Sequence, residues 1–178
     1  MANPYRKSTV LPPEGKNFPL FPKLIATSFG AGFLPVAPGT WGALMAIVLW
    51  LPLYIWAGTA TTLIVTSAAI IVLGILGTWA SSVSEKYWGP DPVVACVDET
   101  VGQWISLLPV LPFCPWWEIV LSLALFRFFD IFKPLGIRAT EKLPRGYGMM
   151  ADDVLAGIYS AVIILLLNQF VITPHGMA

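Results

Sequence analysis

Half of the ten acidic side chains in this 178-residue chain fall into three short groups that could bind a cation. The groups are Asp98-Glu99, Asp130 and Asp152-Asp153. Two adjacent acids inside the otherwise apolar stretch 93–112 would be costly to bury unless a cation accompanies them. Oxygen ligands without histidine or cysteine favour magnesium or calcium over zinc. The residue types therefore predict a site for a hard divalent cation.

Simpler roles are possible for two of these groups, and the sequence leaves them open. Asp152 and Asp153 precede an apolar segment, so they could cap a helix and complement its dipole. Asp130 could pair with Arg127, because residues three positions apart are neighbours on a helix. A negative charge just before Pro134 would oppose the dipole of a helix ending there. An ion pair and a functional role for Asp130 are therefore both open.

Basic side chains near the acidic groups indicate phosphate chemistry. They are Arg127, Lys133, Arg138, Lys142 and Arg145. A metal held by carboxylates, together with Arg and Lys side chains, is typical of sites that bind a phosphoryl group. Anchoring to anionic lipid is the alternative, and it accounts best for Arg138 and Lys142.

Two glycine-containing turns precede apolar segments and could present backbone N–H groups to an anion. The first, 35–40, includes Gly39 and Thr40, and the second, 145–153, includes Gly148. The first turn could also be no more than a rigid entry loop. A Gly-x-Gly pattern by itself is weak evidence for an anion site.

The elements that must position these residues are long apolar segments. The chain is 57% hydrophobic and 11% charged, with a mean hydropathy of +0.76, whereas an ordinary soluble domain is about 25% charged. No charged residue lies between Lys23 and Glu85, and none follows Asp153. A membrane-spanning helix needs about 20 apolar residues. The composition therefore predicts an all-α, polytopic membrane bundle rather than a soluble monomer.

We expect four or five membrane crossings, with five preferred, in a single domain over residues 1–178. The expected segments are 41–57, 61–82, 93–112, 116–132 and 153–171, with turns at 57–59 and 112–115. Residues 1–22 should form an irregular cytoplasmic arm that leads into a short interfacial helix near 20–29. With five crossings all ten basic residues fall on one side, which the positive-inside rule makes cytoplasmic. The acidic groups would face the same side.

Several classes of function are disfavoured. Ten basic and ten acidic residues cancel, so no basic field attracts nucleic acid. No Cys-x5-Arg pattern follows Cys96 or Cys114, and the single histidine, His175, lies in the C-terminal tail. These observations disfavour a phosphotransfer mechanism that uses a cysteine or histidine nucleophile. A transporter subunit or ion binder remains a competing class, but it would need charges at mid-depth in several spans.

Four segments taken together resemble the phosphatidylglycerophosphatase A family. In chain order they are FGAGFLPVAPGTWG at 29–42, VDETVG at 97–102, FRFFDIFKP at 126–134 and GMMADDVLAG at 148–157. The ordered set is specific, although no single piece would be. Two loop positions depart from the family pattern: Gly136 replaces a usual second proline, and Arg145 replaces a frequent glycine.

The resemblance implies a magnesium-dependent phosphatase of the bacterial inner membrane that converts phosphatidylglycerophosphate to phosphatidylglycerol and phosphate. Magnesium would be bound, and catalysis carried out, by the five carboxylates Asp98, Glu99, Asp130, Asp152 and Asp153. Arg127 and Lys133 would hold the terminal phosphate, while N–H groups near Gly39, Thr40 or Gly148 would contact the inner phosphodiester. We expect in-line attack by a metal-activated water, with an aspartyl-phosphate as the less favoured route. Membrane lipids are the expected surroundings, without an obligate protein partner.

Overall fold

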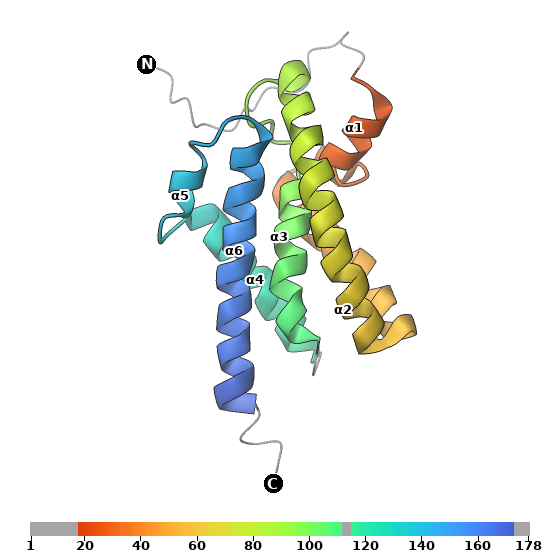
Figure 1. The fold of residues 1–178 in the computed structure, drawn as a ribbon, viewed down its shortest axis with the longest axis vertical. Helices are drawn as coiled ribbons and strands as arrows, with labels where there is room; N and C mark the ends of the chain where they lie inside the picture. The colour runs from red at the N-terminus through yellow and green to blue at the C-terminus, as the bar shows by residue number, and fades with distance from the viewer. Residues whose placement is uncertain (1–17, 112–114, 173–178) are drawn as a thin grey trace.

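The computed structural model describes residues 18–111 and 115–172, and helices dominate them (Figure 1). The expected all-α class is therefore confirmed. In chain order the elements are α1 (Leu20–Ala26), the short 3₁₀ turn η1 (Ala31–Phe33), α2 (Pro38–Trp88), α3 (Val97–Leu107), the 3₁₀ turn η2 (Leu108–Val110), α4 (Trp116–Phe132), α5 (Ile137–Thr140), α6 (Gly146–Leu167) and a π-helical end (Asn168–Ile172).

The longest helix, α2, consists of two arms that meet at Gly58. The backbone of Gly58 has φ +77° and ψ 172°, which breaks the helix and which a residue with a side chain adopts only at a cost. Leu49 and Trp50 of the first arm line one apolar groove together with Val65 and Ala69 of the second. The chain therefore turns back on itself at Gly58 (Figure 1). The break lies within the predicted turn at 57–59.

The two middle helices differ in how closely they match the expected segments. Helix α4 has the expected bounds, 116–132, and it ends just before the residue that precedes Pro134, as helices usually do. Lys133 itself adopts the left-handed conformation. Helix α3 covers only 97–107 of the expected 93–112. Eleven residues rise about 16 Å, roughly half the thickness of the hydrocarbon core. Helix α3 is thus a short, buried centre for the bundle (Figure 1).

Helix α6 begins at Gly146, seven residues before the expected start at Asp153. Its first residue packs on the second arm of α2, where the Gly146 N–H donates to Ser82 Oγ over 3.2 Å. A Cβ on Gly146 would lie 2.5 Å from the Thr78 carbonyl oxygen. Asp152 and Asp153 therefore lie inside the helix, after its first turn. This rules out the helix-capping role that the sequence had left open for them.

Helices α3 and α6 cross where two glycines face each other. A Cβ on Gly157 would overlap the carbonyl oxygen of Gly102, and a Cβ on Gly102 would lie 2.6 Å from the carbonyl oxygen of Asp153. Small residues let helix backbones approach closely. Close contact at this point brings the acidic turn of α6 against that of α3.

Two helices of the described part are long and apolar enough to cross a membrane, α2 and the segment Gly146–Phe170. Many large apolar side chains on them are exposed, among them Ile64, Ile71, Ile75 and Leu165. Such surfaces suit lipid contact. The expected arm before residue 18, the turn at 112–114 and His175 lie outside the described residues.

Candidate active site

The first turn of α3 is fixed to the N-terminal part of the chain by buried hydrogen bonds. The Cys96 N–H donates to the carbonyl oxygen of Ala26 over 2.8 Å. The Ser28 and Thr100 hydroxyls are 2.7 Å apart, and Thr100 Oγ1 also donates to the Gly42 carbonyl oxygen over 3.0 Å. These bonds hold the first turn of α3 against the neighbouring α1 and α2 segments. They thereby fix the backbone from which the Asp98 and Glu99 side chains extend.

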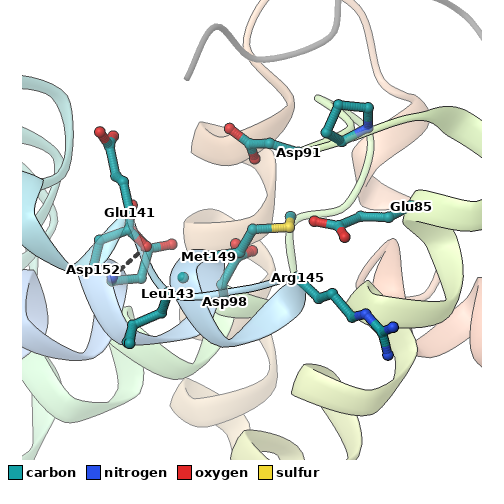
Figure 2. Close-up of a pocket in the computed structure, with 11 residues that line it drawn as sticks. Glu85, Asp91, Asp98, Glu141, Leu143, Arg145, Met149 and Asp152 are labelled. Atoms are coloured by element: carbon teal, nitrogen blue, oxygen red, sulfur yellow. Dashed lines mark hydrogen bonds between the residues drawn. The ribbon is translucent and has the colours of Figure 1, made fainter. Parts of the chain in front are cut away.

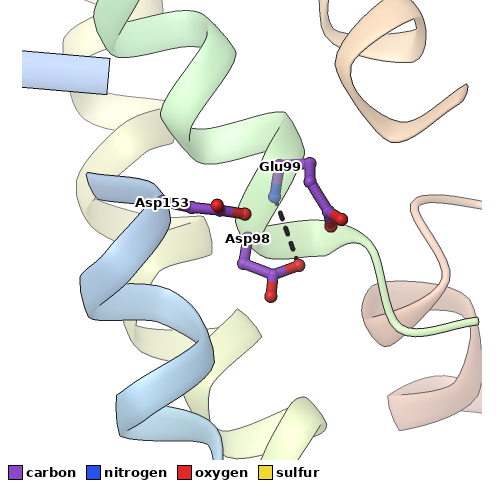
Figure 3. A group of neighbouring side chains, drawn as sticks. All are labelled: Asp98, Glu99 and Asp153. Carbon is purple, nitrogen blue, oxygen red and sulfur yellow. Dashed lines mark hydrogen bonds between the residues drawn. The ribbon is translucent and has the colours of Figure 1, made fainter. Parts of the chain in front are cut away.

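Three buried carboxylates from two helices converge at this turn (Figure 3). Asp98 and Glu99 come from α3 and Asp153 from α6, and one oxygen from each lies within 4.8 Å of the other two. Their exposed fractions are 2%, 2% and 3%. We call them the carboxylate triad. Asp130 and Asp152 are close enough for their charges to act on Asp153, so all five predicted acids belong to one electrostatic cluster.

The triad fits a hard divalent cation. Oxygen ligands around magnesium lie about 2.0–2.1 Å from the ion, which places neighbouring or opposite ligand oxygens about 3–4 Å apart. The observed spacing of at most 4.8 Å allows all three to approach one ion. Several buried carboxylates in close proximity repel one another unless positive charge accompanies them. The donor set is all oxygen, which favours magnesium or calcium.

Each of the other two acids forms an ion pair with a basic side chain. Arg127 Nη1 lies 2.6 Å from Asp130 Oδ2, one helical turn apart on α4. This is the ion pair that the sequence offered as the alternative role for Asp130. Lys133 Nζ bonds to Asp152 of α6 and lies 2.7 Å from Glu141 Oε1. The five acids thus divide into a triad and two paired residues.

Lys133 carries its charge in a largely enclosed position. Burial lowers its pKa, but the Asp152 charge and the hydrogen bonds to Asp152 and Glu141 outweigh burial and raise the pKa above its ordinary value. The side chain therefore remains a cation at neutral pH. Its position beside Asp152 puts a fixed positive charge next to the triad.

The predicted glycine positions lie at the same site. A Cβ on Gly39 would overlap Glu99 Oε1 and lie 3.0 Å from Arg127 Nη1, so the first turn of α2 rests directly against both side chains. Thr40 follows in that turn and is half-buried. Gly148 lines the cavity beside the triad, but its N–H donates to the Arg145 carbonyl oxygen over 3.1 Å. Gly148 therefore contributes a close backbone wall.

A cavity of about 190 Å³ opens over Asp98, Asp152 and Asp153 (Figure 2). Glu85, Asp91 and Glu141 also line it, and Arg145 is its one basic lining residue. The Arg145 side chain points away from Asp98 and Asp152 in Figure 2. The cavity is therefore strongly acidic, which favours binding of a cation. A cation bound there could in turn hold an anionic group.

A second depression adjoins the first, and it contains three basic side chains in addition to three acidic ones. Arg127, Lys133 and Arg138 line it, together with Asp130 and Ile131. Asp91 and Glu141 line both hollows. We call the first hollow the acidic cavity and the second the basic depression. Together they form one polar region at the ends of α3, α4 and α6.

Sequence reasoning missed three residues of this region: Glu85, Asp91 and Glu141. Glu85 lies near the end of α2 and Asp91 in the following loop, where single acids are common and unremarkable. Glu141 lies among basic residues of the α5–α6 loop. Its separation of eight positions from Lys133 corresponds to no regular helical contact. Only the chain reversal around α5 brings the two together.

The amino-acid sequence is similar to those of known lipid phosphatases. A family model described as phosphatidylglycerophosphatase A matches residues 24–168. A Haemophilus influenzae protein named phosphatidylglycerophosphatase A is 36% identical over 172 residues, covering 96% of this chain and 98% of its own. An Escherichia coli protein of the same name is 33% identical, covering 82% and 83%.

A further relative carries a different name. A Bacteroides thetaiotaomicron protein named "Putative phosphatidylinositol-3-phosphatase" is 47% identical over 144 residues, which cover 80% of this chain and 91% of that protein. No solved structure matches the chain. All three relatives have the names of lipid phosphatases, which favours an enzyme over the competing transporter class.

Proposed function

The chain belongs to the phosphatidylglycerophosphatase A family, and we propose that it is a phosphatase that hydrolyses phosphatidylglycerophosphate to phosphatidylglycerol and inorganic phosphate. The observation that carries the proposal is the carboxylate triad flanked by the Arg127–Asp130 and Lys133–Asp152 pairs. This site combines cation ligands with fixed positive charges. Such a combination suits a phosphomonoester better than a neutral substrate.

In this proposal Asp98, Glu99 and Asp153 bind magnesium. Bound there, the ion supplies positive charge for the phosphate oxygens and makes a water more acidic. Arg127 and Lys133 face the terminal phosphate, and their charges stabilise the negative charge of the transition state. A triad carboxylate oxygen accepts the proton of the attacking water.

Asp130 and Asp152 act through their basic partners. Each holds a long, flexible cationic side chain in one place, which reduces the entropy lost when the phosphate binds. Asp130 and Asp152 also add negative charge around the triad. They therefore contribute indirectly to magnesium binding, through water, in addition to positioning their basic partners. Gly39 and Thr40 form the wall behind Glu99 and Arg127, and Gly148 forms the wall of the acidic cavity.

The same proposal places the protein in the bacterial cytoplasmic membrane, as a multi-pass protein with its site on the cytoplasmic face. Support comes from the two membrane-length helices and from the distribution of basic residues. Acyl chains of the substrate would stay in the lipid, and only the headgroup would enter the polar region. The relatives from Haemophilus influenzae and Escherichia coli are bacterial proteins, which agrees with this location.

Phosphatidylinositol 3-phosphate is the second candidate substrate, because the 47%-identical relative is named for its hydrolysis. Both lipids combine a terminal phosphomonoester with an inner phosphodiester, so one site chemistry serves either. The test is phosphate release by the purified protein from each lipid in the same detergent micelles. We expect a higher kcat/KM for phosphatidylglycerophosphate, and the reverse order would assign the enzyme to inositol lipids.

A further inference from the structure

Within the described residues, one of the three basic side chains that line the basic depression has no ion-pair partner. Of its three basic residues, Arg127 pairs with Asp130, and Lys133 pairs with Asp152 and Glu141. Arg138 forms no ion pair with any residue of the described chain, yet it lines the depression beside them. It is exposed on the short helix α5. Its guanidinium group is therefore free to bind an anion from outside.

The proposed substrate contains a second anionic group that could bind to Arg138. Phosphatidylglycerophosphate carries a terminal phosphomonoester and, one glycerol unit away, an inner phosphodiester with a single negative charge. The acidic cavity and its neighbours Arg127 and Lys133 account for the first group only. The basic depression adjoins that cavity and shares Asp91 and Glu141 with it, so a headgroup of two linked phosphates can extend from one hollow into the other.

We propose that the Arg138 side of the basic depression is the subsite for the inner phosphodiester, next to the Arg127 and Lys133 side chains that hold the terminal phosphate, and that Arg138 is its principal contact and a determinant of substrate specificity. This inference rests on the proposed function. A planar guanidinium group can donate two parallel hydrogen bonds to the two free oxygens of a phosphodiester. Because Arg127 and Lys133 already have acidic partners, Arg138 supplies the charge that matches the additional phosphate.

The sequence suggested a different role for Arg138, namely anchoring on anionic lipid together with Lys142. The structure separates the two residues. Lys142 is also exposed and lies four positions further along, but it lines neither the acidic cavity nor the basic depression. Lys142 is therefore the matched control, because its substitution removes the same charge from the same segment of the chain without touching the proposed subsite.

The experiment compares Arg138→Gln, Arg138→Lys and Lys142→Gln with the unmodified enzyme. Substrates are phosphatidylglycerophosphate and phosphatidic acid, which lacks the inner phosphodiester, in the same micelles. For Arg138→Gln we expect kcat/KM on phosphatidylglycerophosphate to fall about 10- to 100-fold, and on phosphatidic acid less than about threefold. Arg138→Lys should lie between, because it keeps the charge but loses the paired hydrogen bonds. Lys142→Gln should leave both values unchanged.

A soluble probe removes the membrane from the comparison. Glycerophosphoglycerol, the deacylated headgroup of the product, contains the phosphodiester without acyl chains or a terminal phosphate. Its inhibition constant should rise about tenfold or more in Arg138→Gln and stay constant in Lys142→Gln. This measurement does not depend on how fast phosphatidic acid is turned over.

The results that would overturn the subsite are distinct from those that would overturn the function. Equal losses on both lipids with an unchanged inhibition constant would make Arg138 a membrane anchor. Unchanged kinetics in Arg138→Gln would remove it from the site altogether. If the unmodified enzyme released no phosphate from phosphatidylglycerophosphate, the proposed function would fall and the subsite with it.

Discussion

At the scale of single residues, the main result is a division among five acids that look alike in the sequence. Asp98, Glu99 and Asp153 face one another, whereas Asp130 and Asp152 each hold a basic side chain. Asp152 and Asp153 are adjacent in sequence, but successive residues point about 100° apart on a helix. One therefore faces Lys133 and the other faces α3.

This division predicts different behaviour for two neighbouring, conservative substitutions. Asp153→Asn removes a proposed cation ligand, so kcat/KM should fall by at least about 100-fold and half-saturation by magnesium should move to higher concentration. Asp152→Asn leaves the triad intact and removes one of the two acidic partners of Lys133, so that only Glu141 still holds it. We expect a loss of about 10- to 100-fold, with a rise in KM and a smaller change in magnesium dependence.

A magnesium titration of phosphate release by each variant separates the two roles. Circular dichroism and size-exclusion chromatography in detergent verify that both variants fold. Equal shifts in the magnesium dependence of the two variants would show that Asp152 binds the cation as directly as Asp153 does.

The side-chain pairings show where sequence reasoning reaches its limit. The Arg127–Asp130 pair could be predicted from the sequence because both residues are on one helix, three positions apart. The Lys133–Asp152 pair joins the end of α4 to α6, and the Gly39–Glu99 contact joins α2 to α3. Contacts of this kind depend on how helices pack, which the periodicity of a single sequence does not determine.

At the scale of the elements, the backbone contact of α3 with α6 positions the triad. Gly157 packs on the Gly102 carbonyl, close to Asp153. Gly157→Ala should therefore push the helices apart, lowering thermal stability and activity together. Gly74→Ala is the matched control, since a Cβ there meets no atom within 4 Å. Alanine is favoured over glycine inside helices by about 1 kcal/mol, so Gly74→Ala should be neutral or stabilising.

Thermal unfolding in detergent, monitored by circular dichroism, gives the comparison directly. We expect a lower Tm for Gly157→Ala and an unchanged or higher Tm for Gly74→Ala. A Tm for Gly157→Ala that equals or exceeds that of Gly74→Ala would contradict the role assigned to this helix crossing.

Element boundaries were predictable where a local signal marks them. Gly58 ends the first arm of α2 and Pro134 follows α4, and both ends were expected from the sequence. The start of α6 was missed, because its first turn, around Gly146 and Gly148, contains residues that normally favour loops. Contact of Gly146 with α2 stabilises this helical turn, and such tertiary packing overrides local propensity.

At the scale of the whole molecule, the proposal fixes which face of the membrane carries the site. Single cysteines at Lys86 and Lys142, in a Cys114→Ser background, should react with a membrane-impermeant thiol reagent only from the cytoplasmic side. Cys96 is buried and should contribute little background. Reaction of either position in intact spheroplasts, where only the outer face is accessible, would reverse the orientation and separate the site from cytoplasmic substrate.

The central claim is that buried carboxylates bind a divalent cation and thereby support hydrolysis of phosphatidylglycerophosphate. The most direct test is phosphate release from this lipid by the purified protein, first stripped with a chelator and then supplied with magnesium. We predict no release above background after stripping and full recovery with magnesium, but no recovery in the Asp153→Asn variant. Undiminished release by the stripped protein, or full activity of Asp153→Asn, would contradict it.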